Sequence, residues 1–85
     1  MVFPFVPPRV ERMWMKNTHI ELDMLFVDAA GRISKITRRA QPLRLNTISS
    51  DAPVSAVVEL RDGEAARLTL SVGDLVSWTG AAAGR

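Results

Sequence analysis

The stretch that decides the fold is residues 20–27, with the sequence IELDMLFV. Apolar side chains recur at every second position, which is the period of a β-strand. The opposite face begins polar with Glu21 and Asp23 and becomes apolar at Leu25 and Val27. A strand that is apolar on both faces is covered on both sides. Residues 20–27 are therefore predicted to form a central strand that starts half exposed and ends buried.

A helix is the alternative for the start of this stretch. Thr18 and Glu21 have the spacing of a capping box, which often marks the first turn of a helix. The unbroken alternation from Ile20 to Phe26 outweighs that local signal, because a helix buries residues with a period of 3.6. We therefore expect a strand.

Neighbouring segments extend the sheet. Residues 54–61, VSAVVELR, alternate cleanly and give the clearest strand pattern in the sequence. Residues 12–16, RMWMK, place two methionines on one face, which predicts a short strand with the methionines in the core. Residues 28–31, DAAG, have the composition of a turn, so residues 32–38 are expected to return as an antiparallel partner.

The remaining segments are less regular. Residues 1–10 contain three prolines, which predicts an extended loop because proline lacks an N–H donor. Residues 40–52 are polar and irregular, which is typical of a surface connection. For residues 62–70 we expect a short helix capped by Asp62, and a hairpin turn at Asp62 and Gly63 is the alternative.

Length and composition predict one domain over residues 1–85. The 85 residues are 47% hydrophobic and 24% charged, which is an ordinary globular composition. A strand over residues 75–79 and a frayed tail over residues 80–85 complete the chain. The expected fold class is mainly β (α+β at most), a small, partly open β-barrel or twisted antiparallel sheet of about five strands with one short helix near 64–70.

Several function classes find no support in the sequence. There is no cysteine, which excludes disulfides, thiolate metal sites and thiol nucleophiles. The longest apolar run, residues 24–27, is far shorter than the ~20 residues of a membrane-spanning helix. The first residues lack the basic region and long apolar core of a secretory signal peptide. Neither glycine-rich phosphate-binding motif occurs. No cofactor is predicted.

Three potential metal ligands lie on one face of the predicted central strand. His19, Glu21 and Asp23 alternate, so neighbouring side chains would be about 6.6–6.8 Å apart, which is within reach of a metal. The simpler interpretation is a solvated strand face, because metal sites usually draw support from other elements. We therefore predict no metal site.

A hydroxyl nucleophile is also weakly supported. Ser49 or Ser50 could be combined with His19 and Asp51, but no nucleophile-elbow pattern fixes that geometry. No catalytic residue is predicted from this set.

Basic side chains cluster around the predicted hairpin: Arg32, Lys35, Arg38, Arg39 and Arg44. Alternation directs Arg32 and Arg38 to one face and Lys35 and Arg39 to the other. Because these residues form no single stripe, a nucleic-acid partner is not expected.

One wall of a polar pocket is suggested near residue 16. Trp14 and Lys16 share a strand face, and the Asn17 amide follows them. The alternative role for Asn17 is structural, as a turn residue. With Asp23, these residues form the predicted ligand-binding set: Trp14, Lys16, Asn17 and Asp23.

The sequence resembles the family called domain of unknown function 192 over nearly all of residues 1–79. The resemblance rests on residues 13–18, residue 20, residues 22–28 and residues 31–33, and it continues at Ala40, Pro42, a serine of the 49–50 pair, residues 57–60, Gly63 and residues 73–74. It implies a compact β-rich domain with minor helix and no assigned activity. Many members carry export signals or membrane anchors, so the resemblance is compatible with an exported or periplasmic protein.

Two departures from the family pattern matter. Family domains usually have a further strand before the segment that starts this chain, so the domain is expected to be shortened at its N-terminus. Glu21 replaces a common proline. A missing edge strand would leave a sheet edge exposed, and we therefore expect a homodimer through that edge.

The sequence leaves two function hypotheses. The leading one is a noncatalytic module that binds a small molecule or a protein through the predicted set. The alternative is a small hydrolase or metal-dependent enzyme that uses His19, Glu21 or Asp23, which requires these groups to converge in a cleft.

Overall fold

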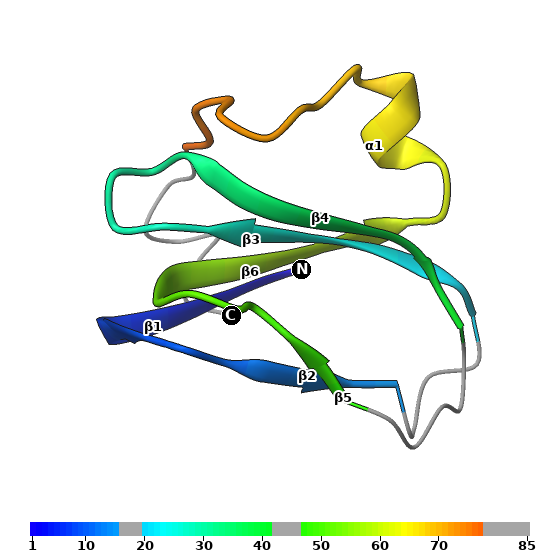
Figure 1. Cartoon of the computed structure of the whole chain (residues 1–85). Coiled ribbons are helices and arrows are strands. Elements are labelled where there is room, and N and C mark those ends of the chain that lie inside the picture. The colour runs from blue at the N-terminus through cyan, green and yellow to red at the C-terminus, as the bar shows by residue number, and fades with distance from the viewer. Residues whose placement is uncertain (16–19, 42–46, 78–85) are drawn as a thin grey trace.

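The computed structural model of the chain describes residues 1–15, 20–41 and 47–77 (Figure 1). Within these ranges six strands form two antiparallel sheets beside one short helix. The four-stranded sheet has the order β1 (Val2–Arg9), β6 (Val54–Arg61), β3 (Leu22–Val27) and β4 (Ile33–Ala40). The two-stranded sheet joins β2 (Arg12–Trp14) to β5 (Thr47–Ser49). The helix is α1 (Glu64–Arg67). The mainly β prediction is confirmed, and the described strands do not close into a barrel.

Strand β3 is the central strand that its sequence predicts, but it begins at Leu22, so Ile20 and Glu21 precede it and Ile20 is exposed. It pairs with β4 on one side and β6 on the other, and every residue from Asp23 to Val27 is buried. Met24 and Phe26 belong to one core, and Leu25 and Val27 belong to the other. Full burial of a side chain such as Phe26 contributes about 1.5–3 kcal/mol, so β3 anchors both layers.

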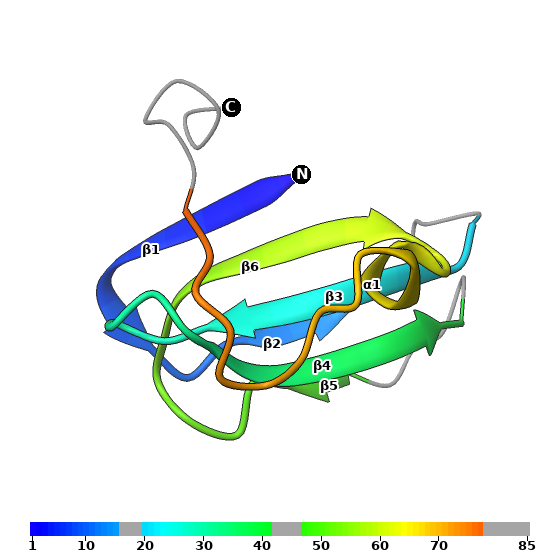
Figure 2. The same cartoon turned by 90° about the horizontal axis from the view of Figure 1, so that it is seen from above.

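Different elements cover the two faces of the four-stranded sheet. The β2–β5 sheet lies over one face, where Met15 is buried and Met13 and Ile48 pack against the core (Figure 1). Helix α1 and the segment 68–77 lie over the other face, as the view from above shows (Figure 2). The predicted core position of the methionines is therefore confirmed for Met13, Met15 and Met24.

The hairpin between β3 and β4 forms as predicted. Asp28 Oδ1 accepts hydrogen bonds from the backbone N–H groups of Ala30 and Arg32, at 2.9 and 3.0 Å. Gly31 has a φ of 82°, a conformation that favours glycine. The turn also holds the C-terminal segment, because the Val76 N–H donates to the Gly31 carbonyl at 2.8 Å.

Two segments expected to be irregular are strands. Residues 2–9 form β1 at the edge of the sheet, where Phe3 pairs with Val57, and the register shifts between Pro4 and Arg9. Residues 47–49 form β5, because Met13 and Ile48 pair across the small sheet and bury their side chains. Both strands depend on partners distant in sequence, which local composition does not reveal.

The prolines of β1 bear on the predicted homodimer. Proline cannot donate to a neighbouring strand, and natural sheet edges use it to limit pairing with other chains. Pro4, Pro7 and Pro8 are all exposed in this edge strand. The homodimer stays a prediction.

The C-terminal part of the fold differs from expectation in two details. The helix covers only Glu64–Arg67, and its N-cap is Gly63 with a φ of 88°, so Asp62 does not cap it. Leu75 makes an isolated bridge to Arg32 in place of a strand over residues 75–77. The rest of the predicted strand and the predicted frayed tail lie outside the described residues.

Candidate functional site

The structure separates two members of the predicted ligand-binding set. Trp14 is half exposed on β2, in the sheet that covers one face of the main sheet. Asp23 is buried on the opposite face, under α1. Lys16 and Asn17 lie outside the described residues, as does His19. Trp14 and Asp23 therefore do not meet in one pocket.

Asp23 joins three elements through its carboxylate. It is 1% exposed. Its Oδ1 accepts a hydrogen bond from the Arg39 backbone N–H at 3.0 Å, and its Oδ2 accepts one from the Ala65 N–H at 2.9 Å. Arg39 has a φ of 53°, which is uncommon for a residue other than glycine. The carboxylate therefore holds the strained end of β4 and the first turn of α1 against β3.

A depression of about 490 Å³ lies where β3 begins and β6 ends. It is open to solvent, and we call it the strand-end depression. The described residues that line it are Ile20, Glu21, Arg61 and Asp62. Ile20 is exposed although it is apolar. The strand ends place these residues together, because Leu22 and Arg61 are paired in the sheet.

The acidic side chains around Arg61 are engaged by other residues. Asp62 Oδ1 lies 3.5 Å from the Arg39 Nε. Glu64 accepts two hydrogen bonds from the Arg67 guanidinium, at 2.6 and 2.9 Å, and these bonds lower the pKa of the Glu64 carboxyl. Glu21 Oε2 accepts a hydrogen bond at 2.8 Å from the amide of Gln41, which is neutral.

The Arg61 guanidinium makes no hydrogen bond or ion pair with the described residues, and the residue is exposed. Its charge contributes to the lowered pKa of the Glu64 carboxyl. A guanidinium offers five donors in a planar fork that matches a carboxylate. The strand-end depression therefore presents one cation, Arg61, and one anion, Glu21, that form no ion pair with the described residues.

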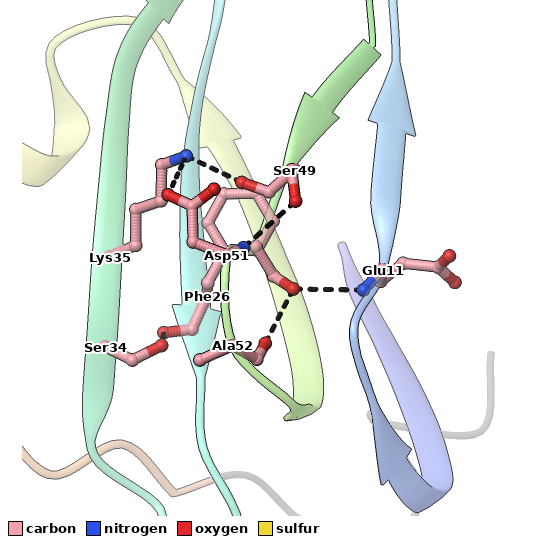
Figure 3. A network of polar contacts seen from close by, with 8 residues as sticks. Glu11, Phe26, Ser34, Lys35, Ser49, Asp51 and Ala52 are labelled. Carbon is pink, nitrogen blue, oxygen red and sulfur yellow. Dashed lines mark hydrogen bonds and ion pairs between the residues drawn. The ribbon is translucent and has the colours of Figure 1, made fainter.

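A second polar cluster connects the two layers of the fold (Figure 3). The Lys35 ammonium donates to the Ser49 carbonyl at 2.6 Å and to Asp51 Oδ2 at 2.8 Å. Its Nζ also lies 5.7 Å from the centre of the Phe26 ring. Because the ammonium is committed to these groups, we assign Lys35 a structural role.

The neighbouring Ser50 is equally occupied. Its hydroxyl is buried, accepts a hydrogen bond from the Glu11 N–H at 3.0 Å and donates one to the Ala52 carbonyl at 2.7 Å (Figure 3). Ser49 Oγ accepts a hydrogen bond from the Asp51 N–H at 3.0 Å. The histidine of the predicted nucleophile set, His19, lies outside the described residues, so the predicted set stays a prediction.

The described ranges contain no group of three or more histidine and acidic side chains arranged to hold a metal ion. No helix within them has the length and apolarity needed to cross a membrane.

Burial raises the pKa of the Glu59 carboxyl, which is partly covered on β6.

Sequence reasoning overlooked Arg61 and Lys35 as members of polar clusters. Arg61 is the last residue of a strand with a clean alternating pattern, and no motif singles it out. Lys35 was assigned to a basic group around the hairpin. Neither role has a local signal, because both depend on residues that other strands supply.

Comparisons with known proteins agree with this fold. The crystal structure of a protein of unknown function from Novosphingobium aromaticivorans DSM 12444 has a TM-score of 0.88 and 38% identity, over 92% of this chain and 56% of that one. A crystal structure from Sinorhizobium meliloti 1021, named "putative transcription regulator", has a TM-score of 0.85 and 44% identity, over 88% of this chain and 58% of that one.

The chain thus spans a little more than half the length of either solved relative. None of the curated proteins matches it significantly. The model of the family DUF192, described as "Uncharacterized ACR, COG1430", matches residues 1–78. The chain therefore belongs to the DUF192 family.

Proposed function

We propose that this domain is a noncatalytic module that binds a small ligand or a protein segment at the strand-end depression. The observation that carries the proposal is the contrast between Arg61 and the other charged groups. The side chains of Asp23 and Lys35 are bound within the fold, whereas the exposed Arg61 guanidinium forms no hydrogen bond or ion pair with the described residues.

The shape of the depression supports the same function. Its volume of about 490 Å³ lies in the range typical of small-molecule sites, roughly 300–1,000 Å³. The exposed Ile20 supplies an apolar wall beside the charged groups. Lys16 and Asn17 precede Ile20 closely in the sequence, so we retain them as candidate contacts.

The enzyme hypothesis has less support. Both oxygens of Asp23 already accept backbone hydrogen bonds. If Asp23 gave up these bonds to act in catalysis, two N–H donors would be left without partners. Glu21 and Asp23 differ in environment, since Glu21 lies at the solvent-facing depression and Asp23 lies under α1. Their alternation in the sequence therefore does not bring them together in a cleft.

The binding function can be tested by NMR with the ¹⁵N-labelled chain. The probes are a panel of free amino acids, terminally blocked dipeptides, nucleosides and monosaccharides. We expect at least one probe to cause saturable shifts in the backbone amides of Glu21, Arg61 and Asp62. If no probe does so, or if the shifts are scattered over the molecule, the proposed site is wrong.

The enzyme hypothesis has a separate test. Hydrolysis of p-nitrophenyl acetate is measured with and without added Zn²⁺. We expect the rate to equal the buffer rate. A faster rate that disappears in Glu21→Gln or His19→Ala, with Arg12→Gln unchanged as the control, would establish the hydrolase instead.

A further inference from the structure

We infer that the ligand of the strand-end depression is a free α-amino acid with an apolar side chain. This inference rests on the proposed function. It adds the chemical class of the ligand, which is inferred from the two charged side chains of the depression, Arg61 and Glu21, that form no ion pair with the described residues.

The first charge is the Arg61 guanidinium. Three acidic residues belong to its surroundings. Glu21 and Asp62 line the same depression, and the Arg61 charge helps to lower the pKa of the Glu64 carboxyl. Asp62 is paired with Arg39, and Glu64 is bound by Arg67 through two hydrogen bonds. Arg61 is thus left to bind an external anion, and its planar fork matches a carboxylate.

The second charge is the Glu21 carboxylate. Its described hydrogen-bond donor is the Gln41 amide, which carries no charge to neutralise it. A ligand ammonium would supply that charge. A free α-amino acid carries an ammonium and a carboxylate on one carbon atom, so a single small molecule can compensate Glu21 and Arg61 together.

The apolar side chain of the proposed ligand is inferred from Ile20. This residue is 56% exposed at the wall of the depression. An aliphatic side chain placed against it would remove apolar surface of both partners from water, which is favourable. Leucine therefore meets the three requirements of the site.

The test compares three ligands on the ¹⁵N-labelled full chain. L-leucine carries both charges, N-acetyl-leucine lacks the ammonium and L-leucinamide lacks the carboxylate. We expect L-leucine to shift the amides of residues 20–21 and 61–62 with saturation. A charge-assisted hydrogen bond corresponds to about tenfold or more in affinity, so each analogue should bind at least about tenfold more weakly.

Matched variants locate the interaction. Arg61→Gln should lower the affinity for L-leucine and N-acetyl-leucine but leave the affinity for L-leucinamide unchanged. Glu21→Gln should lower the affinity for L-leucine and L-leucinamide. Arg12→Gln changes an exposed arginine on β2; it is the control and should leave the affinity for all three ligands unchanged. Circular dichroism melting confirms that each variant is folded.

The outcomes separate this inference from the proposed function. Equal binding of L-leucine and either analogue overturns the zwitterion assignment. If L-leucine causes no shifts while another panel member shifts the same amides, the ligand class is wrong and the binding function stands. If no panel member shifts them, both proposals are wrong.

Discussion

The carboxylate of Asp23 accepts a hydrogen bond at 2.9 Å from the backbone N–H of Ala65, which lies 42 positions later in the chain. This contact fixes the first turn of α1 to the central strand. The N-cap residue Gly63 offers no side-chain cap, so a buried group on another element satisfies a backbone donor of the helix.

Removing the Asp23 carboxylate should destabilise the fold. Asp23→Ala leaves the part-buried N–H of Arg39 and the buried N–H of Ala65 without acceptors, and each such donor costs about 1–3 kcal/mol, which gives a total of roughly 2–6 kcal/mol. Asp23→Asn should cost less, because its amide oxygen still accepts one bond. Urea unfolding followed by circular dichroism measures both changes.

Asp51→Asn is the control for Asp23. Its side chain is 70% exposed and pairs with Lys35 at the surface, so its loss should cost less than about 1 kcal/mol. A loss from Asp23→Ala no larger than that of the control would contradict the bridging role of Asp23.

Ser50 should contribute to stability and not to catalysis. Its hydroxyl joins the Glu11 N–H to the Ala52 carbonyl in a buried position, so Ser50→Ala should destabilise the protein by about 1–3 kcal/mol. Ser49→Ala should cost less because its partner, the Asp51 N–H, lies near the surface. Equal midpoints of thermal unfolding for the two variants would refute this difference.

Glu59 should make stability depend on pH. Burial raises the pKa of its carboxyl, so the folded state holds this proton at a pH where the unfolded state has released it. The stabilisation is therefore complete below the unfolded pKa of about 4.3 and is lost as the pH rises through the folded pKa.

Glu59→Gln removes this proton equilibrium. From pH 4 to pH 7, the free energy of unfolding should fall more for the natural protein than for the variant, as measured by urea unfolding at both pH values. Parallel pH dependence in the two proteins would show that Glu59 has an ordinary pKa.

Lys16 and Asn17 are the members of the predicted ligand-binding set that lie outside the described residues. Lys16→Ala and Asn17→Ala should each weaken a ligand found by NMR about tenfold, the usual effect of one lost charged or polar contact, while the melting temperature stays unchanged. Arg12→Ala serves as the control. If both variants unfold, these residues have a structural role and the predicted patch is wrong.

Much of the fold was predictable from short-range patterns. The alternation in residues 20–27 and 54–61 predicted β3 and β6, and the turn composition of residues 28–31 predicted the β3–β4 hairpin. These features are local, because neighbouring residues determine both the two-residue period of a strand and the formation of a turn. By contrast, β1 and β5 were missed because their strand form depends on pairing with β6 and β2.

The candidate site was not predictable from local patterns. The two described members of the predicted ligand-binding set, Trp14 and Asp23, are not among the described residues that line the strand-end depression. Sequence analysis grouped Trp14 with Asp23, which the sheet places on opposite sides. It could not identify Arg61, whose importance arises from ion pairs that engage Asp62 and Glu64 elsewhere.

The sequence by itself determined that residues 22–27 form a central strand, because only a strand covered on both sides suits that change from polar to apolar on one face. Tertiary structure alone decided what the polar residues of this stretch do. Asp23 is a buried bridge to Arg39 and Ala65, whereas Glu21, which precedes β3, lines the strand-end depression. The physical reason is that α1 covers one carboxylate and not the other.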